Sequence, residues 1–232
     1  MRKATIKRII DIFWIGAIAL IILGLALNGS EVIYPKKYQK LIRCTCKLEH
    51  LSPDGRVWGS GTLTKHGILS VYHLVEGRVR GKLIASFQDG TTIVTREVHL
   101  AWFDPSADLA LFTLDSPLPK GWGHIKLAKK SKIGEKIAFA GFNSAALARL
   151  RFDFMEEYIK YGTMIHPVWF GDSGGGVFNA NNRLIGIIKV LIFNEFYGYP
   201  VATLCGYATS LDKIHRFMDE YQHWLDVRNN VK

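Results

Sequence analysis

Short apolar and alternating runs, separated by turn residues, follow one another along most of the chain after residue 40. Turn signals such as Pro53-Asp54-Gly55 and Asp89-Gly90 break the pattern at short intervals, which is typical of β-strands. The first predicted strands are Leu41–Leu48, Gly59–Leu63, Gly67–Val75, Lys82–Phe87, Thr92–Leu100 and Leu109–Leu114. A second set comprises Lys136–Phe142, Tyr158–Ile165, Gly174–Phe178, Leu184–Ile192 and Val201–Thr209. Strands this short and regular predict two β-halves in tandem, each a barrel or a sandwich.

The two sets of strands are separated by a stretch rich in proline and glycine, and the second set is followed by a helical pattern. Leu114 to Lys136 contains two prolines and three glycines and is interpreted as a linker. After Ser210, a plausible N-cap, apolar residues recur at a spacing of three and four: Leu211, Ile214, Met218, Tyr221 and Leu225. We therefore predict β-halves at residues 41–120 and 121–209 and a C-terminal helix at 210–232.

The first 30 residues have a different pattern. Four cations in residues 2–8 precede an uncharged run from Ile12 to Leu27. The length of this run falls between that of a signal-peptide core and the roughly 20 residues of a membrane-spanning helix. Because the run is apolar on every face, a buried core helix is a weak alternative. We predict an uncleaved signal anchor at residues 1–30 and a juxtamembrane linker at 31–40; cleavage near Gly24-Leu25-Ala26 would instead give a secreted protein.

The distribution of charge predicts how this segment is oriented in the membrane. No cation follows the apolar run until Lys36. Positive charge before a membrane span holds the N-terminus inside, so everything after Ser30 is expected on the extracytoplasmic side.

Composition and charge narrow the function classes. The chain has 232 residues, of which 48% are hydrophobic and 22% charged, as in globular proteins. Of the net charge of +10, residues 1–43 contribute +6, from eight Lys and Arg residues and two acids, and the rest of the chain +4. The basic excess is thus concentrated beside the anchor, and no aromatic-basic motif stands out, so nucleic-acid binding has little support.

Three cysteines, Cys44, Cys46 and Cys205, make an odd number that no disulfide framework can use completely. Cys44 and Cys46 would point to the same face of a strand, which is a poor geometry for bonding to each other. Together with Cys205 and His50 they could hold a structural zinc ion, but the spacing matches no common zinc motif. We interpret them as small buried thiols.

The segment Gly171-Asp172-Ser173-Gly174-Gly175 carries the sharpest chemical signal. A serine hydroxyl is a poor nucleophile at neutral pH and needs a base within reach and donors for the oxyanion it creates. Glycines around the serine let the backbone turn tightly and aim its N–H groups at a substrate carbonyl. A glycine-rich hairpin turn would explain two of the glycines but not the full run.

With these residues in view, the chain resembles the chymotrypsin-like serine proteases and is most similar to the catalytic domain of the HtrA type. Beyond the serine, the resemblance rests on motifs distributed over residues 41–225: Gly59-Ser60-Gly61, Gly67 through His73, Asp108-Leu109-Ala110-Leu111, Ile133-Gly134-Glu135-Lys136, Ala140-Gly141-Phe142, Leu184 through Ile187 and Gly206-Tyr207-Ala208. The order His, Asp, Ser, with gaps of 35 and 65 residues, is also that of the family. The chain ends soon after the predicted helix, so no PDZ domain is expected.

The resemblance implies an all-β fold of two tandem six-stranded antiparallel β-barrels with a C-terminal helix, here preceded by the predicted transmembrane helix. It implies that Ser173 attacks, His73 acts as the base and Asp108 orients the imidazole, while the N–H groups of Gly171 and Ser173 bind the oxyanion. It also implies protein or peptide substrates and no cofactor or metal.

Two aspartates require comment. Asp104 is a rival to Asp108, but the apolar Leu109-Ala110-Leu111 favours Asp108, because a triad carboxylate is held buried at a strand edge. In zymogen-type relatives the residue at Asp172 pairs with a freed N-terminus. That kind of N-terminus is absent here, so Asp172 must find another partner or face solvent.

The resemblance also places the pocket for the residue before the scissile bond. It would be lined by Pro167, Val168, Val190, Leu191 and Cys205. None of these is acidic, so a substrate Arg or Lys would be buried without a counter-charge. We expect cleavage after small or medium aliphatic residues.

Three functions follow, of which an active serine endopeptidase is favoured. The alternatives are a viral or phage polyprotein-processing protease of the same fold, since compact members with an N-terminal membrane segment occur there, and an inactive protease-fold binding protein. The complete set of His73, Asp108 and Ser173 argues against the inactive protein.

Overall fold

The computed structural model describes residues 35–53, 55–78, 80–90, 92–142, 149–154, 156–158, 162–165, 168–196 and 199–230. The chain divides into two units, Met1–Pro35 and Lys36–Lys232, and the fold described here is that of the second. The predicted signal anchor at residues 1–30 lies outside the described residues. Among the described helices, none is both long and apolar enough to cross a membrane.

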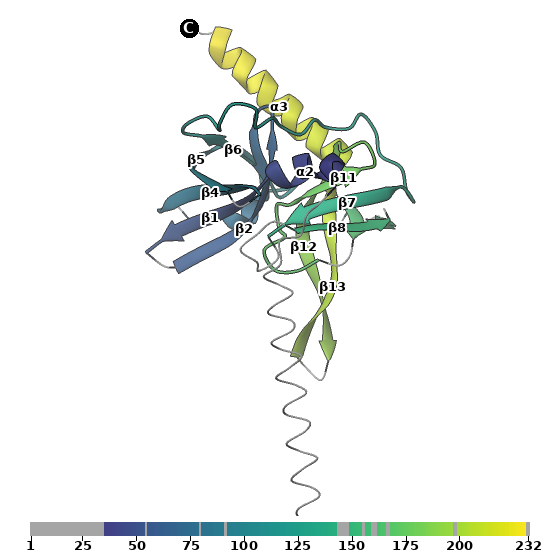
Figure 1. Cartoon of the computed structure of the whole chain (residues 1–232). Coiled ribbons are helices and arrows are strands. Elements are labelled where there is room, and N and C mark those ends of the chain that lie inside the picture. Colours follow the sequence, from purple (N-terminus) through teal and green to yellow (C-terminus); the bar gives the residue numbers. More distant parts are fainter. Residues whose placement is uncertain are drawn as a thin grey trace, which may run out of the picture. The chain divides into compact units, whose positions relative to one another are not determined.

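The first half of this unit is a closed barrel of six antiparallel strands in the order β1-β2-β3-β6-β5-β4 (Figure 1). The strands are β1 (Thr45–Ser52), β2 (Gly55–Thr64), β3 (Gly67–Ser70), β4 (Lys82–Asp89), β5 (Thr92–Asp104) and β6 (Leu109–Leu114), with a 3-10 helix η1 (Tyr72–Leu74) after β3. Its interior is filled by fully buried apolar side chains, the largest being Phe87 and Phe112. The six-stranded barrel predicted for this half is confirmed.

The second half is a seven-stranded antiparallel sheet, whereas the sequence predicted a second six-stranded barrel. Its order is β8-β7-β11-β12-β13-β10-β9, so its two outer strands follow one another in the chain. The strands are β7 (Lys136–Gly141), β8 (Arg149–Phe154), β9 (Glu156–Tyr158), β10 (Gly162–Ile165), β11 (Gly176–Asn179), β12 (Leu184–Phe196) and β13 (Tyr199–Ser210). Figure 1 shows the paired β12 and β13 continuing beyond their neighbours as a two-stranded ribbon.

Two features of the second sheet were not predicted from the sequence. One is strand β8, although its charged residues Arg149, Arg151 and Asp153 alternate with apolar ones, as is typical of a strand. The ribbon formed by β12 and β13 runs past the predicted strand ends at Ile192 and Val201, because the backbone pairing of two adjacent strands continues without an apolar face to signal it.

Two helices flank the sheets. The C-terminal helix α3 (Leu211–Asn230) confirms the predicted apolar stripe, and its first residue packs into the core of the second sheet. Helix α2 (Lys36–Arg43) was not expected, because these residues were assigned to a linker and to the start of a strand. Its last turn buries Leu41 and Ile42, and Thr45 Oγ1 donates to the Leu41 carbonyl (2.8 Å) where β1 begins.

The segment between the two halves, residues 115–135, forms backbone hydrogen bonds with both of them. Ile125 N–H donates to the carbonyl of Leu63 in β2 (2.9 Å), and Ala128 N–H donates to the carbonyl of Leu184 in β12 (2.9 Å). Residues 125–128 thus form short parallel bridges to a strand of each half, Ile125 to Thr64 and Leu127 to Leu184. The predicted linker is therefore a structural connection that fixes one half against the other.

The cysteines of β1 and its N-terminal turn are buried free thiols, as the sequence indicated. Cys44 and Cys46 are both fully buried. Burial raises the pKa of the Cys44 thiol to about 11 and also raises that of Cys46, so both stay protonated and unreactive near neutral pH. The side chain of Cys205 lies outside the described residues. Among the described side chains, no three potential metal ligands gather at one point.

Candidate active site

His73 and Asp108 are joined by two hydrogen bonds. His73 lies in η1, just after β3, and Asp108 in the turn between β5 and β6. The imidazole Nδ1 is 2.9 Å from Asp108 Oδ2, and the backbone N–H of His73 donates to Asp108 Oδ1 at 2.9 Å. With Nδ1–H donating to the carboxylate, the other ring nitrogen, Nε2, is left as the acceptor. The carboxylate thus fixes both the ring orientation and the tautomer that a general base needs.

Asp104, the rival carboxylate, has a different part in the same turn. Its Oδ1 accepts from the N–H and hydroxyl of Ser106 (2.8 and 2.7 Å) and from the N–H of Ala107 (3.1 Å). Burial alone would raise the pKa of Asp104, but these hydrogen bonds hold it below the ordinary value. Asp104 therefore shapes the turn that presents Asp108, which itself has a left-handed backbone with φ of 54°.

Asp172 forms hydrogen bonds within its own loop, which also carries Ser173. The Asp172 side chain is fully buried, and its Oδ2 accepts from the N–H of Trp169 at 2.8 Å. In return, the N–H of Asp172 donates to the carbonyl of Trp169 at 3.1 Å, and the N–H of Gly175 donates to the carbonyl of Asp172 at 2.7 Å. The partner that the sequence left open is thus the backbone of the loop itself.

Ser60 attaches this loop to the first barrel. The Ser60 N–H donates to the carbonyl of Ser173 (2.7 Å), and the Ser60 hydroxyl donates to the carbonyl of Gly171 (2.6 Å). The same hydroxyl accepts from the N–H of Phe142 at the end of β7 (2.9 Å), and the Ser60 carbonyl accepts from the hydroxyl of Ser70 in β3 (2.6 Å). One buried serine therefore connects the loop that carries Ser173, β7 and the strand that leads to His73.

Gly59 places Ser173 beside the residue that follows His73. A Cβ added at Gly59 would lie 2.8 Å from the carbonyl oxygen of Ser173 and 2.9 Å from two side-chain carbons of Leu74. The Ser173 backbone and η1 therefore converge on the same point of β2. The sequence reasoning used Gly59-Ser60-Gly61 only as a family motif and missed that it joins the two halves of the site.

The proposed oxyanion donors lie on a glycine turn that Trp58 covers. Gly171 has a φ of 89°, and a Cβ there would lie 2.0 Å from the Trp58 ring. In the described part of the chain, neither the N–H of Gly171 nor that of Ser173 has an acceptor. An oxyanion hole requires donors without a protein acceptor, so these two N–H groups are candidates for that role.

The predicted specificity-pocket residues are only partly described. Val168 is buried in the core of the second sheet with Ile188 and Ala208. Val190 and Leu191 lie on β12 opposite residues 207 and 206 of β13, next to Cys205, but the side chains of these three residues lie outside the described part. Pro167 lies outside it altogether.

The sequence matches the family model of the trypsin-like peptidase domain over residues 57–187. These residues run from β2 to β12 and include the His73–Asp108 pair and the Ser173 loop. The chain therefore belongs to the trypsin-like peptidase domain family.

Solved structures with the same fold include HtrA-type serine proteases. A serine endoprotease from Yersinia pestis is similar over 82% of this chain and 67% of its own, with a TM-score of 0.63 and 18% identity. An HtrA-type protease solved with a tripeptide is similar over 81% of this chain and 63% of its own, with a TM-score of 0.64 and 18% identity. The chain thus spans about two thirds of the length of these structures. No curated protein matches the sequence.

Gly174 cannot carry a side chain without displacing the Ser173 loop. Its φ is 89°, and a Cβ there would lie 1.9 Å from the Ser60 carbonyl oxygen and 2.1 Å from Ser70 Oγ. The Gly174 N–H donates to the carbonyl of Ile188 (2.7 Å), which prevents the loop from moving away freely.

We expect Gly174→Ala to destabilise the fold far more than the matched Gly134→Ala. Gly134 also has a positive φ, of 76°, but nothing lies within 4 Å of its Cβ position. The control should lose about 1–2 kcal/mol from backbone strain. Gly174→Ala should lose a further ~1–3 kcal/mol from the clash. Urea unfolding of both variants measures this, and equal losses would contradict the close docking of the loop.

Proposed function

We propose that the protein is a serine endopeptidase that cleaves peptide bonds through Ser173, His73 and Asp108. The observation that carries the proposal is the pairing of His73 with both carboxylate oxygens of Asp108. Membership of the trypsin-like peptidase domain family supports a peptidase and protein substrates. The attachment of the Ser173 loop to Ser60 supports the choice of nucleophile, because it holds that loop beside the strand and turn of His73.

In the proposed mechanism, His73 Nε2 takes the hydroxyl proton as Ser173 Oγ attacks the substrate carbonyl carbon. Asp108 stabilises the imidazolium that forms, and the free N–H groups of Gly171 and Ser173 bind the oxyanion. His73 then returns the proton to the leaving amine, which breaks the C–N bond and leaves an acyl-enzyme. Water, deprotonated by His73, hydrolyses the ester and restores Ser173.

Two alternative functions differ from this proposal, one in its substrate and the other in having no catalytic activity. A viral or phage polyprotein-processing protease would use the same residues and would differ by cutting its own precursor. An inactive binding protein would not need the His73–Asp108 pair. The presence of this pair favours an active enzyme.

We expect a fluorophosphonate probe to label the protein at Ser173 and the Ser173→Ala variant to lose labelling. Replacing Ser173 or His73 by Ala should lower peptide hydrolysis by about 10³- to 10⁶-fold, because triad residues act as a unit. Unfolding midpoints should change little, since the His73 side chain is 39% exposed. Wild-type proteolysis in Ser173→Ala, with Lys213→Ala on the exposed face of α3 as the matched control, would refute the assignment.

Specificity is proposed from the residue types at the pocket positions. Because Val168, Val190, Leu191 and Cys205 offer no carboxylate, cleavage is expected after Ala, Val or Leu. Discrimination between neighbouring sizes should stay at roughly 10- to 200-fold, since one methylene is worth about 1–3 kcal/mol in an apolar pocket. Mass spectrometry of a cleaved peptide library tests this, and dominant cleavage after Arg or Lys would contradict it.

We further propose that the catalytic unit is anchored to a membrane on its extracytoplasmic side. The proposal is supported by the four cations that precede the apolar run Ile12–Leu27. A periplasmic-type reporter fused after Lys232 should be active only when exported, and the protein should remain in the membrane fraction. Reporter activity confined to the cytoplasm would reverse the topology, and release into the medium would favour the cleaved signal peptide.

A further inference from the structure

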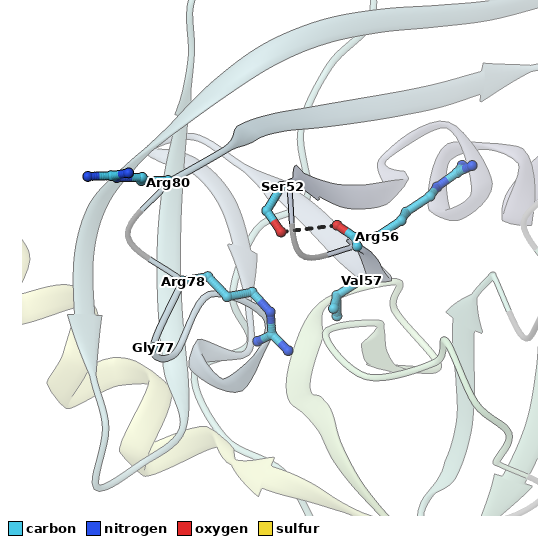
Figure 2. A pocket seen from close by; sticks show the side chains of 7 residues that line it. Ser52, Arg56, Val57, Gly77, Arg78 and Arg80 are labelled. Carbon is cyan, nitrogen blue, oxygen red and sulfur yellow. Dashed lines mark hydrogen bonds between the residues drawn. The ribbon is translucent and has the colours of Figure 1, made fainter.

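A basic cavity lies beside the turn that carries His73 (Figure 2). Its volume is about 440 Å³, within the range of ligand-binding pockets. The β1–β2 hairpin lines one side of it with Ser52, Arg56 and Val57, and the segment after η1 lines the other with Arg78 and Arg80. Arg78 reaches into the cavity, whereas Arg56 and Arg80 lie at its rim with their side chains pointing away from it (Figure 2). An arginine in a cavity with further positive charge at the rim favours an anionic ligand.

Arg78 is the member of this cavity that is tied to His73. Its Nη1 donates to the backbone carbonyls of His73 (3.2 Å) and Glu76 (3.3 Å). Figure 2 shows the side chain extending from its loop toward Val57. Since two carbonyls hold one end of the guanidinium, its remaining N–H groups are pre-organised to bind a carboxylate.

Few acidic groups offset the charge of the cavity. Arg56 forms an ion pair with Glu49, which also pairs with Lys47 at 3.0 Å. Among the described residues, no carboxylate pairs with Arg78 or Arg80. The nearest other acids in sequence are Glu76, which is exposed, and Asp54, which lies outside the described residues.

The field of Arg78 is also visible at a neighbouring group. The pKa of His50 in β1 is lowered, first by burial and then by the charge of Arg78. His50 packs under the loop at Gly81, where a Cβ would lie 2.7 Å from the imidazole Cε1. Arg78 therefore lies close enough to act on His50 as well as on the cavity.

The cavity lies beside the elements that carry the proposed catalytic groups. Val57, which lines it, is followed in β2 by Trp58, whose ring packs on Gly171. In the proposed mechanism His73 protonates the leaving amine, so the substrate segment that follows the scissile bond departs past His73. Arg78 is bonded to the His73 carbonyl, which puts the cavity on that leaving side.

We propose that this cavity binds acidic side chains of the substrate on the leaving-group side of the scissile bond. The enzyme therefore prefers protein segments that carry Asp or Glu shortly after the cleavage point. This inference rests on the proposed function and adds a substrate class to it.

The test compares two peptides with the same residues before the scissile bond and either Glu-Glu or Gln-Gln in the second and third positions after it. Their kcat/KM ratio should favour the acidic peptide by about 3- to 20-fold, because each exposed ion pair is worth a few-fold. In Arg78→Gln/Arg80→Gln the ratio should fall to within about 2-fold of unity. Using a ratio cancels any general loss from the Arg78–His73 bond. The preference of the wild type should also fall as salt is added, since salt screens exposed charges.

Arg183→Gln is the matched control, because Arg183 is an exposed arginine on the β11–β12 turn and should keep the wild-type ratio. A ratio near unity in the wild type, with the neutral peptide still cleaved, would overturn this inference and leave the proposed function standing. So would an undiminished ratio in the double variant. If the double variant does not fold, Arg80→Gln alone should still lower the ratio.

A binding measurement separates this inference from the failure of the proposed function. Fluorescence anisotropy of the labelled Glu-Glu peptide on the Ser173→Ala protein needs no catalysis, and we expect binding that weakens with the double variant. If the wild type neither cleaves peptides nor reacts with the fluorophosphonate probe, the proposed function fails. The anisotropy measurement alone then shows whether the cavity binds acidic peptides. Absence of binding, or tighter binding of a single-stranded DNA of equal charge, would overturn the inference.

Discussion

The arrangement of the site depends on the hydrogen bonds of one buried serine. Ser60 uses its N–H, its hydroxyl and its carbonyl to contact, respectively, Ser173, Gly171 and Ser70, and its hydroxyl also accepts from Phe142. In the buried interior such bonds are costly to lose, because each partner would be left unsatisfied. The loop that carries Ser173, which belongs to the second half of the chain, is thereby held at a fixed distance from the first barrel.

This constraint explains the glycines on both sides of the contact. The backbone of the loop approaches β2 so closely that a methyl group at Gly174 would meet the Ser60 carbonyl, and one at Gly59 would meet the Ser173 carbonyl. A glycine loses more conformational entropy on folding than any other residue, which lowers the stability of the fold. In return, it lets the two backbones approach closely enough to form hydrogen bonds. The same network also holds the strand that leads to His73. This strand, β3, ends at Ser70, whose hydroxyl donates to the Ser60 carbonyl.

The sequence was sufficient for the first barrel and the C-terminal helix, because each leaves a local pattern. His73 and Asp108 end or begin apolar strands, and the structure brings them into hydrogen-bonding contact. The role of Ser60 could not be predicted in this way, since its partner Gly171 is 111 residues away and the bond involves backbone atoms that have no sequence signature. Helix α2 was missed because most of its residues are polar or charged and only Leu41 and Ile42 at its end are buried.

Asp172 contributes to the shape of the loop through bonds within the loop itself. Its carboxylate is buried against the N–H of Trp169, and its own N–H returns a bond to the same residue. Two reciprocal bonds across three residues fix the turn that leaves the N–H groups of Gly171 and Ser173 without acceptors among the described residues. A donor pair that is oriented before a ligand arrives pays no reorganisation cost during reaction. The same turn packs against the ring of Trp58, so it is held to β2 by this side chain as well as by the hydrogen bonds of Ser60.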